Sequence, residues 1–543
     1  MKNRKINYSL LLIAFVFLAF VANASDIKIK ITKTYLNIPV GKQARMKLIK
    51  IYSGNKELRE FPVQLAEQKV DYWIFIDVNE FKGKTITLTS YASTAALKRI
   101  YQADKIAGAD SLYKESNRPQ FHFTVKRGWN NDINGPIYYK GTYHLFWQAF
   151  PFGNSWYTAY MYWGHATSKD MLHWTETAPA LMLDSLGSPW SGTAVIDKNN
   201  DGGWGKDAMV LYYTAFDVVS GGKQVQCIAY STDGGKTFKR YKGNPVIDSN
   251  DEMHSNDTRD PKVFYYEPTK TWVMVLFERD GLSFYNSKDM KTWSKQSHFK
   301  GLHECPDFFE MAVDGNLANK KWVLHGGSSD YYIGTFDGKE FHPESPRLSY
   351  AKGDLYAAES FANMPGDRHV QMAWGRIEHP GMPFNQMMLF PTEFSLNTTK
   401  DGLRLYANPI KEIETLHTLI KEFGNATLRE ANTILKNIKP GPLHIKMSTE
   451  TKSGQNIRLF YQGNELANFT AQDLPNERNN IEILIDKTVA EIFINNGEQY
   501  IVKKLGTPLN DTGLSFQVDA NFQQDNPGAF IKKIMIYQMK SVW

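Results

Sequence analysis

Three short segments of the chain each place a carboxylate among turn-forming and aromatic residues. They are residues 129–135 (Trp-Asn-Asn-Asp-Ile-Asn-Gly), 259–261 (Arg-Asp-Pro) and 304–307 (Glu-Cys-Pro-Asp). Two carboxyl groups on either side of a glycosidic bond are the minimum needed to hydrolyse it. A third carboxylate, beside an arginine, can stabilise positive charge that develops on the sugar ring. The segments therefore indicate a site for sugar hydrolysis, with Asp132, Asp260 and Glu304 as its candidate residues.

Asp132 and Asp260 each have a simpler interpretation when taken alone. Asp132 lies among Asn and Gly residues, where a carboxylate commonly caps a turn. Arg259 adjoins Asp260, which predicts a lowered pKa for that carboxyl and keeps it ionised, as a charge stabiliser requires. An ordinary surface ion pair is the alternative. Neither residue identifies a site without the others.

Glu304 is the candidate general acid, and two nearby carboxylates compete with it. Partial burial near Cys305 and the following phenylalanines predicts a raised pKa for Glu304, which suits a proton donor. Asp307 and Glu310 follow within the same segment. The case for a site depends on the three segments occurring together in one fold.

A loose repeat between residues 117 and 397 predicts the elements that carry these segments. Two strands are followed by a Ser/Thr-x-Asp turn and, four or five residues after the Asp, an aromatic residue. The four visible copies have their Asp at Asp170, Asp233, Asp289 and Asp337. A spacing of roughly 50 to 60 residues is typical of propeller blades. The Asp would close the turn and the aromatic would pack between sheets. A diverged copy at 356–394 makes five blades, and a β-sandwich with coincidental hairpins is the alternative.

The flanking regions also predict mainly β-structure. Residues 27–93 alternate apolar and polar residues with a period of two, which predicts a small β-domain. Residues 96–113 look helical and would link it to the propeller. A short helix at 409–422 would lead into a second β-domain with a tight hairpin at 495–497 (Asn-Asn-Gly).

Composition limits the class of protein. The 543 residues are 42% hydrophobic and 13% aromatic, and carry a net charge of +6. This length predicts about two to four domains. Aromatic excess is common in carbohydrate-active proteins and in large β-proteins alike. The absence of any long Lys/Arg run argues against nucleic acid as a partner. Only Cys227 and Cys305 occur, so the chain is not built on a disulfide framework. We expect two buried free thiols, with a disulfide between the two as the alternative. The 13 histidines form no close ligand cluster in the sequence, and no metal or cofactor is expected.

The N-terminus has the pattern of a cleavable signal peptide. Lys2, Arg4 and Lys5 precede an apolar stretch, residues 10–21, that is too short to span a bilayer. Ala22-Asn23-Ala24 supplies a small-x-small cleavage site. We expect cleavage after Ala24 and a secreted or periplasmic protein, with an uncleaved membrane anchor as the alternative.

The order of the motifs resembles glycoside hydrolase family 32, the β-fructofuranosidases, and in its later part the levanase and inulinase branch. The resemblance runs from about residue 118 to the C-terminus. It rests on the three carboxylate segments and on these further stretches: 118–123, Gln148, 163–165 (Trp-Gly-His), 190–192 (Trp-Ser-Gly), 356–358 (Tyr-Ala-Ala) and 381–386 (Gly-Met-Pro-Phe-Asn-Gln). It implies an all-β chain with a five-bladed β-propeller, residues 116–405, and a C-terminal β-sandwich, residues 406–543. Residues 25–115, the small N-terminal β-domain, resemble accessory domains that precede some bacterial members.

The resemblance also implies roles for individual residues. Asp132 would be the nucleophile, Glu304 the general acid and then base, and Asp260 the transition-state stabiliser. The fructose subsite would be lined by Asn131, Gln148, Trp156, Trp190, Ser191, Arg259 and Asp354. Two departures stand out. Ile133 replaces the proline usual after the nucleophile, which frees the backbone there, and the stretch 156–163 is longer than usual.

These roles imply a secreted enzyme that cleaves terminal β-fructofuranosidic bonds of levan, inulin or sucrose with retention of configuration. Retention requires the carboxyl groups of Asp132 and Glu304 to lie about 5 to 5.5 Å apart. The alternatives are an endo-levanase, a fructosyltransferase and a non-catalytic fructan-binding protein. A fructan is the expected partner, without nucleic acid and without a membrane span in the mature chain.

Overall fold

The computed structural model describes residues 24–156, 159–218, 222–248, 257–451, 456–469, 478–510, 513–518 and 529–543. The chain forms two compact units, one ending at Asp71 and resuming over Ile76–Asp104, the other comprising Tyr72–Phe75 and Lys105–Trp543. The predicted signal peptide, apart from Ala24, lies outside the described residues. Within the described residues, helices of the length and apolarity needed to cross a membrane are absent.

The first unit is built from short strands whose side chains alternate between core and surface. Its four-stranded antiparallel sheet has the order β1-β6-β3-β4. These strands are β1 (Ser25–Lys30), β6 (Thr85–Ser90), β3 (Lys47–Ser53) and β4 (Lys56–Val63). β2 (Tyr35–Val40) pairs with β7 (Tyr101–Ala103), and β5 (Tyr72–Asp77) is divided between the two units. The alternation read from residues 27–93 correctly predicted strands here.

The predicted helix at 96–113 is wrong for most of its length. The α-helix α1 covers only Thr94–Leu97, and two 3₁₀ turns, η1 (Asn79–Phe81) and η2 (Ala109–Ser111), lie on either side of it in the chain. Ser93 caps α1 by accepting a hydrogen bond from the Ala96 N–H. Residues 101–103 instead form β7, because the backbone pairing with β2 outweighs the helix propensity of a short Ala-rich stretch.

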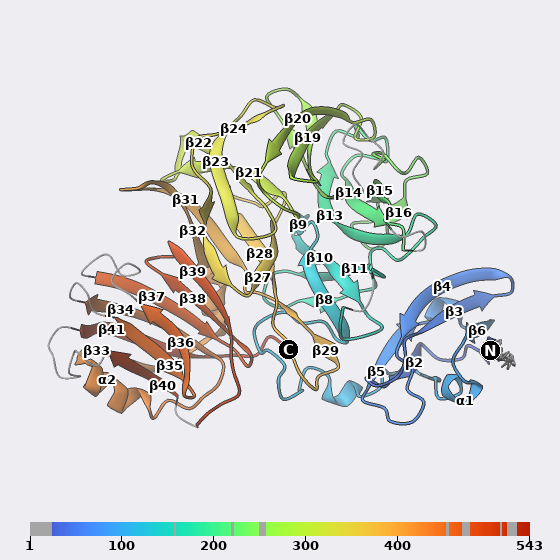
Figure 1. Cartoon of the computed structure of the whole chain (residues 1–543), viewed down its shortest axis with the longest axis horizontal. Coiled ribbons are helices and arrows are strands. Elements are labelled where there is room, and N and C mark those ends of the chain that lie inside the picture. Colours follow the sequence, from blue (N-terminus) through green and yellow to red (C-terminus); the bar gives the residue numbers. More distant parts are fainter. Residues whose placement is uncertain are drawn as a thin grey trace, which may run out of the picture. The chain divides into compact units, whose positions relative to one another are not determined.

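Most of the second unit is a ring of five β-sheet blades, which Figure 1 shows around a common centre. Each blade is antiparallel and contains four main strands, the first of which lies toward the centre. Blade 1 contains β8 (Gly128–Ile133), β10 (Thr142–Phe150), β11 (Tyr162–Ser168) and β12 (Thr175–Glu176), and blade 2 contains β13 (Ser188–Asp197), β14 (Ala208–Phe216), β15 (Gln224–Ser231) and β16 (Lys239–Arg240). Blade 3 contains β17 (Thr258–Tyr266), β18 (Thr271–Glu278), β19 (Gly281–Ser287) and β20 (Ser294–Lys300), and blade 4 contains β21 (Asp307–Val313), β22 (Asn316–His325), β23 (Asp330–Phe336) and β24 (Phe341–Pro343). Blade 5 contains β27 (Leu355–Ser360), β28 (His369–Gly375), β31 (Thr392–Thr399) and β32 (Gly402–Pro409).

Short strands complete the ring. β29, in the segment between β28 and β31 of the fifth blade, pairs with β8 of the first blade, while a single parallel pair, Val313 with Leu396, joins the fourth and fifth blades. The short strands are β9 (Ile137–Tyr139), β25 (Leu348–Ser349), β29 (Phe384–Asn385) and β30 (Met387–Met388). The five-bladed propeller predicted from the repeat is confirmed.

The repeated turns have the geometry that the repeat predicted. Each Asp carboxylate accepts two backbone N–H bonds from its own turn, at 2.7 to 3.0 Å. The aromatic residue that follows packs between neighbouring blades: Phe238 between blades 1 and 2, Trp293 between 2 and 3, and Phe341 between 3 and 4. The repeat therefore closes the turns and fills the interfaces that hold the ring together.

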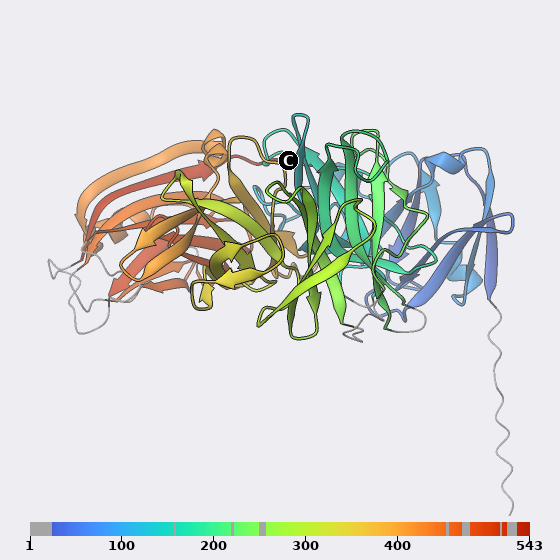
Figure 2. The ribbon, with the colours of Figure 1, turned by 90° about the horizontal axis from the view of Figure 1, so that it is seen from above.

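The C-terminal part of the second unit is a two-layer β-sandwich, seen from above as the orange and red strands in Figure 2. Its seven-stranded sheet consists of β26 (Ala351–Gly353), β39 (Gln499–Lys504), β38 (Val489–Ile494), β37 (Arg478–Ile485), β34 (Leu443–Thr451), β41 (Ala529–Met539) and β33 (His417–Thr427). Its three-stranded sheet consists of β36 (Asn464–Phe469), β35 (Ile457–Tyr461) and β40 (Leu514–Val518). Aliphatic side chains such as Ile445, Ile483 and Leu459 fill the space between the layers, with α2 (Leu428–Leu435) packed beside them.

Two local predictions for this part have opposite outcomes. The hairpin at 495–497 is confirmed: Asn495, Asn496 and Gly497 all have positive φ and connect β38 to β39. The predicted helix at 409–422 is wrong beyond Leu416, because only η3 (Lys411–Leu416) is helical and β33 begins at His417. Residues 417–427 pair along their length with β41, which places them in the sheet.

A buried histidine connects the propeller to the sandwich. The Nδ1 atom of His122 lies 2.9 Å from an Asp486 oxygen and its Nε2 atom lies 2.5 Å from a Glu491 oxygen. Burial alone would lower the pKa of His122, but the hydrogen bonds to the two carboxylates raise it to about 9. A buried cation between two carboxylates therefore holds this junction.

Candidate active site

The inner strands of the propeller bring Asp132 and Ser191 together. Asp132 lies near the end of β8, partly exposed, and Ser191 is buried in β13. The Ser191 hydroxyl donates a 2.7 Å hydrogen bond to Oδ2 of Asp132, and the Asn131 amide donates to its other oxygen at 3.3 Å. The carboxylate is therefore held by neighbours on two blades rather than by a turn.

Asp260 lies in β17, on the next blade, where the strand is irregular. The pairing of β17 with β18 shifts between Arg259 and Lys262, and Asp260 has a φ of 62°. A β-bulge of this kind re-aims a side chain, and it is common next to active sites. The Asp260 N–H donates to the Thr214 hydroxyl at 2.9 Å, and its carboxylate accepts the Cys305 N–H at 3.1 Å.

Glu304 precedes β21 in a strained loop. Glu304 and Cys305 have φ values of 47° and 40°, a left-handed conformation that residues other than glycine rarely adopt. Such strain is concentrated at functional sites. Tyr356 donates a 2.7 Å hydrogen bond to one oxygen of Glu304, and Arg259 donates to the other at 2.5 Å.

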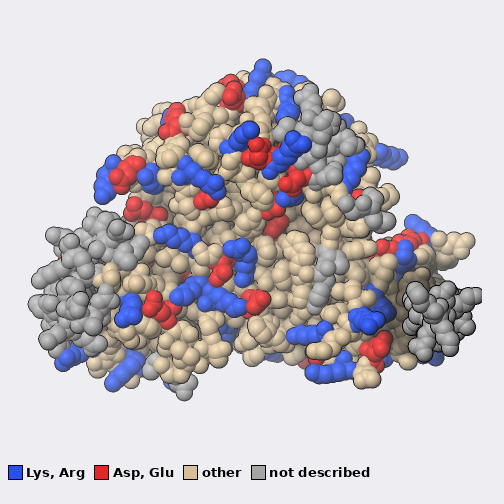
Figure 3. Space-filling model, in the orientation of Figure 1, with Lys and Arg blue, Asp and Glu red and all other residues tan. Residues whose placement is uncertain are grey.

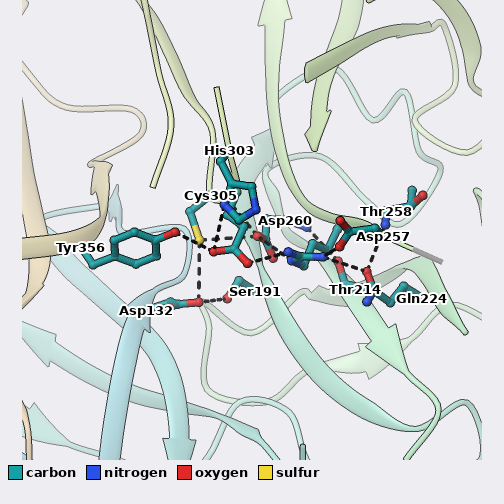
Figure 4. Close-up of polar contacts among 12 residues, drawn as sticks. Asp132, Ser191, Thr214, Gln224, Asp257, Thr258, Asp260, His303, Cys305 and Tyr356 are labelled. Atoms are coloured by element: carbon teal, nitrogen blue, oxygen red, sulfur yellow. Dashed lines mark hydrogen bonds and ion pairs between the residues drawn. The ribbon is translucent and has the colours of Figure 1, made fainter. Parts of the chain in front are cut away.

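Cys305 lies between the two aspartates (Figure 4). Its sulfur is 3.7 Å from Oδ2 of Asp132 and 3.5 Å from Oδ2 of Asp260. Burial and the adjacent carboxylates hold the pKa of the thiol well above its usual range, so it stays protonated and donates to its neighbours. Cys227 is buried in blade 2, and both cysteines are free thiols, as expected.

The pKa predicted for Asp260 is wrong in direction. Burial raises its pKa to about 7, and the nearby Glu304 and Asp132 charges add to the increase. Arg259 lowers the pKa too little to compensate, because its guanidinium binds Asp257 and Glu304 directly and its Nε remains 3.7 Å from Asp260.

The pKa predicted for Glu304 is also wrong in direction. Burial acts to raise it, but the hydrogen bond from Tyr356 and the charge of Arg259 lower it below its ordinary value. Burial raises the pKa of Asp132 to about 6 despite the hydrogen bond from Ser191. In the free protein at mildly acidic pH, Glu304 is therefore ionised while the two aspartates titrate.

Asn131, Gln148, Trp190, Ser191 and Arg259 lie on or beside the inner strands that carry the three carboxylates. Gln148 is buried, and its amide donates to the Pro189 carbonyl at 3.1 Å. Trp190 stacks on Phe216 with the ring centroids 4.1 Å apart. Trp156 is exposed, at 52% of its surface. Asp354 accepts a 3.3 Å bond from the Lys504 N–H of β39, so this carboxylate is oriented toward the sandwich.

The two competitors of Glu304 lie in other environments. Asp307 is fully buried, 2.9 Å from the Lys262 ammonium group, and the charge of Lys262 holds its pKa far below the usual range despite burial. Glu310 is exposed in β21 and pairs with Lys320 at 3.6 Å. Neither environment favours a proton donor at the cluster.

Tyr356, Cys305 and Ile133 were not among the predicted site residues. Tyr356 and Cys305 were identified only as parts of motifs, yet both contact the carboxylates directly. Ile133 pairs with Trp147 in the strand ladder and is buried, so the segment continues as strand where the family usually has proline. In the part of the chain that the structure describes, no group of three or more His, Cys, Asp or Glu side chains is arranged to hold a metal ion.

Comparison with known proteins identifies the family. The model of the N-terminal domain of glycosyl hydrolases family 32 matches residues 122–409. Levanase of Bacillus subtilis (strain 168) is 35% identical over 519 residues, covering 83% of this chain and 74% of that enzyme. The chain belongs to glycosyl hydrolase family 32.

Other relatives agree with this assignment. The levanbiose-producing levanase of Bacillus subtilis (strain 168) is 29% identical, with 75% of this chain and 89% of that enzyme aligned. The extracellular exo-inulinase inuE of Aspergillus niger is 33% identical over 55% of this chain and 65% of its own length. The crystal structure of exo-inulinase from Aspergillus awamori superposes with a TM-score of 0.68 at 24% identity, over 79% of this chain and all of that one, which establishes a shared fold.

The N-terminal region matches a different model. Residues 23–122 match a domain of unknown function, DUF4980, which ends where the family 32 match begins. The match gives no role for the N-terminal domain. The domain boundaries 25–115, 116–405 and 406–543 stay a prediction.

Burial of Asp260 predicts a stability that depends on pH. A carboxyl whose pKa is raised on folding destabilises the folded state at pH values above the folded pKa, and this cost disappears as the pH falls below the ordinary pKa. Asp260→Asn is therefore expected to stabilise the protein by about 2 kcal/mol at about pH 8, with little gain at about pH 4. Thermal unfolding across this range measures the difference. Asp401→Asn, in the exposed turn after β31, is the control, and an equal gain there would contradict the explanation.

Proposed function

We propose that this family 32 protein hydrolyses β-fructofuranosidic bonds at the ends of fructan chains, with retention of configuration, and releases fructose. The observation that carries the proposal is the meeting of Asp132, Asp260 and Glu304, from three different blades, around the Cys305 thiol. The relatives named levanase and exo-inulinase support fructans as the substrate class.

The proposed reaction is a double displacement. Glu304 donates its proton to the glycosidic oxygen while Asp132 attacks the anomeric carbon, so the C–O bond to the leaving sugar breaks as the ester bond to Asp132 forms. Glu304, now ionised, then takes a proton from water. That water attacks the same carbon, releases fructose and frees Asp132 as a carboxylate.

The charge state of the free site has a consequence for this reaction. Glu304 must be protonated to act first as an acid, yet Arg259 and Tyr356 stabilise its ionised form. Substrate hydroxyl groups that draw Arg259 away from Glu304 would raise the pKa of Glu304 and load it with a proton. After fructose leaves, Arg259 would bind Glu304 again, and the pKa of Glu304 would return to its low value in the free protein.

Asp260 is proposed to stabilise the transition state. Its carboxylate, fixed by the Cys305 N–H, would accept hydrogen bonds from ring hydroxyls that tighten as the ring gains positive charge. Asn131, Gln148, Trp190, Ser191 and Arg259 would complete the fructose subsite, with exposed Trp156 at its rim. Asp354 would reach it only by leaving its bond to Lys504.

The surface charge is compatible with a neutral substrate. On the face seen in Figure 3, acidic and basic side chains are interspersed, without a large area of either sign. A neutral polysaccharide needs no complementary electric field for binding. The predicted signal peptide and the similarity to the extracellular exo-inulinase of Aspergillus niger support export of this protein.

The test is to incubate the purified protein with levan, inulin and sucrose and to separate the products by chromatography. Fructose alone is expected from levan or inulin, and fructose together with glucose, to a lesser extent, from sucrose. Oligosaccharide ladders would indicate endo-cleavage, and longer oligosaccharides formed at high sucrose would indicate a fructosyltransferase. Binding without any product would favour a non-catalytic fructan-binding protein and would contradict the proposal.

The similarity to the levanbiose-producing levanase suggests a second candidate function, the release of levanbiose from levan. That enzyme aligns over 89% of its length at 29% identity. Release of levanbiose instead of fructose from levan would favour this candidate over exo-action.

The hydrogen bond from Ser191 predicts how activity depends on pH. Asp132 must be ionised to attack and Asp260 to stabilise the transition state, so kcat/KM is expected to fall as the pH drops from about 7 to about 6. Ser191→Ala removes a donor that stabilises the ionised form, so this acidic limb should move up by about one pH unit. The pH profile of kcat/KM on sucrose measures the shift. An unchanged limb would show that Asp132 does not control it.

A further inference from the structure

A second set of charged groups joins the inner strands of the propeller next to the carboxylate cluster. The Lys262 ammonium group is 2.9 Å from Asp307 Oδ1 and 2.9 Å from Glu359 Oε1. Their side chains are at most 8% exposed. The remaining oxygen atoms bind backbone: Asp307 accepts the Ser360 N–H at 2.7 Å, and Glu359 accepts the Gly135 N–H at 2.5 Å.

These groups come from all five blades. Glu359 belongs to blade 5, Lys262 to blade 3 and Asp307 to blade 4, while the Thr193 hydroxyl of blade 2 donates to Glu359 at 2.8 Å. Gly135 supplies the contact from blade 1. A side chain there would come within 2.0 Å of the Ala194 nitrogen, and its φ is 53°, so only glycine allows the approach. We name Gly135, Thr193, Lys262, Asp307 and Glu359 the axial network.

Each member of the axial network follows a residue of the cluster by two or three positions. The pairs are Asp132 and Gly135, Ser191 and Thr193, Asp260 and Lys262, Cys305 and Asp307, and Tyr356 and Glu359. In four of the five pairs a register shift separates the two residues or adjoins them: between Asn130 and Ile133, between Pro189 and Gly192, between Arg259 and Lys262, and between Tyr356 and Glu359. The first residue of each pair belongs to the carboxylate cluster, and the second contacts the inner strands of other blades.

The two layers also share a boundary. A small cavity between them is lined by Ser191, Asp260 and Cys305 from the cluster and by Glu359 from the axial network. A displacement of one inner strand at the level of Lys262 therefore transfers to the carboxylate two residues away. The strained residues Glu304 and Cys305 depend most on the position of Asp307, because their loop leads directly into β21, which begins at Asp307.

We propose that Lys262 is the positioning residue of this centre, and that its ammonium group, by binding Asp307 and Glu359, holds the inner strands of blades 3, 4 and 5 where Asp260, Glu304 and Tyr356 meet. The inference rests on the proposed function for its kinetic consequence. Catalytic groups must be held within about 0.5 Å of their productive positions. Lys262 thus acts through Asp260 and Glu304 and needs no contact with the sugar.

The test separates positioning from stability by means of two variants. Lys262→Met leaves two buried carboxylates without their cation, so both the melting temperature and kcat are expected to fall. Lys262→Met combined with Glu359→Gln removes the repulsion between the Asp307 and Glu359 carboxylates. This double variant is expected to recover most of the melting temperature. Its kcat on sucrose should remain about 100-fold below wild type, with KM within about threefold, because the strands are no longer tied to one cation.

His122→Gln is the matched control. His122 is also a buried cation between two carboxylates, but it lies at the junction with the sandwich. This variant is expected to lose stability and to keep kcat. Recovery of kcat together with melting temperature in the double variant would overturn the inference, as would an equal loss of kcat in His122→Gln.

A structural readout keeps the inference testable if the proposed function fails. Should wild type release no product from levan, inulin or sucrose, the proposed function is wrong, whereas the role of Lys262 is decided by the crystal structure of the double variant. Displaced Asp260 and Glu304 carboxylates are expected. Their unchanged positions would overturn the inference.

Discussion

Replacing Asp132 by Asn is expected to reduce fructose release by about four orders of magnitude or more. The amide has the shape of the carboxylate and keeps an oxygen for the Ser191 hydrogen bond, but it cannot attack the anomeric carbon. Single replacements of nucleophiles in enzymes cause losses of this size. Initial rates on sucrose, with the most sensitive fructose assay available, measure the effect.

A control is needed because Asp132→Asn also removes a partly buried charge. The variant should bind substrate and unfold at a temperature equal to or above that of the wild type, since burial raises the pKa of Asp132. Ser191→Thr, which retains a hydroxyl, tests whether local packing alone changes the rate. Near-normal turnover by a well-folded Asp132→Asn protein would exclude Asp132 as the nucleophile.

Glu304→Ala is expected to lose about three to four orders of magnitude on sucrose. On an aryl β-fructofuranoside, whose leaving group needs no protonation, azide should restore part of the activity. The variant lacks the acid that protonates the leaving oxygen and the base that activates water. Azide needs no base to attack the fructosyl-enzyme, so the second step becomes independent of Glu304. The product is then fructosyl azide, with the configuration of the substrate.

The azide experiment discriminates between the carboxylates. Asp132→Asn cannot form the ester and should show no rescue. Asp307→Asn breaks the contact with Lys262 and should not yield fructosyl azide either, because Asp307 is buried below the site. Rescue in the Asp307 variant but not in Glu304→Ala would identify Asp307, and not Glu304, as the acid–base residue and would contradict the account. Chromatography and NMR of the azide product provide the measurement.

The fold was largely predictable because its signals are local. Each turn Asp bonds the backbone of its own few residues, and the aromatic that follows it packs one blade away, so the repeat alone indicated the propeller. Residues 417–422 failed as a helix because their partner, β41, lies more than a hundred residues later in the chain. Pairing over such distances leaves no trace in a local pattern.

The same distinction applies to the site. The three carboxylate segments were recognisable as motifs, but their pKa values depend on which side chain Arg259 actually binds. Its guanidinium reaches Glu304, 45 positions away in the chain, rather than the adjacent Asp260. Tyr356 and Lys262 likewise contribute through contacts with other blades. Sequence neighbours therefore gave the wrong sign for both Asp260 and Glu304.

The central claim, a retaining displacement at Asp132, is tested most directly by the stereochemistry of transfer to methanol. The wild-type protein is incubated with sucrose and methanol, and the methyl fructofuranoside is characterised by NMR before it can be cleaved again. Two inversions at the anomeric carbon predict methyl β-fructofuranoside. Methyl α-fructofuranoside would show a single inversion and would contradict the account.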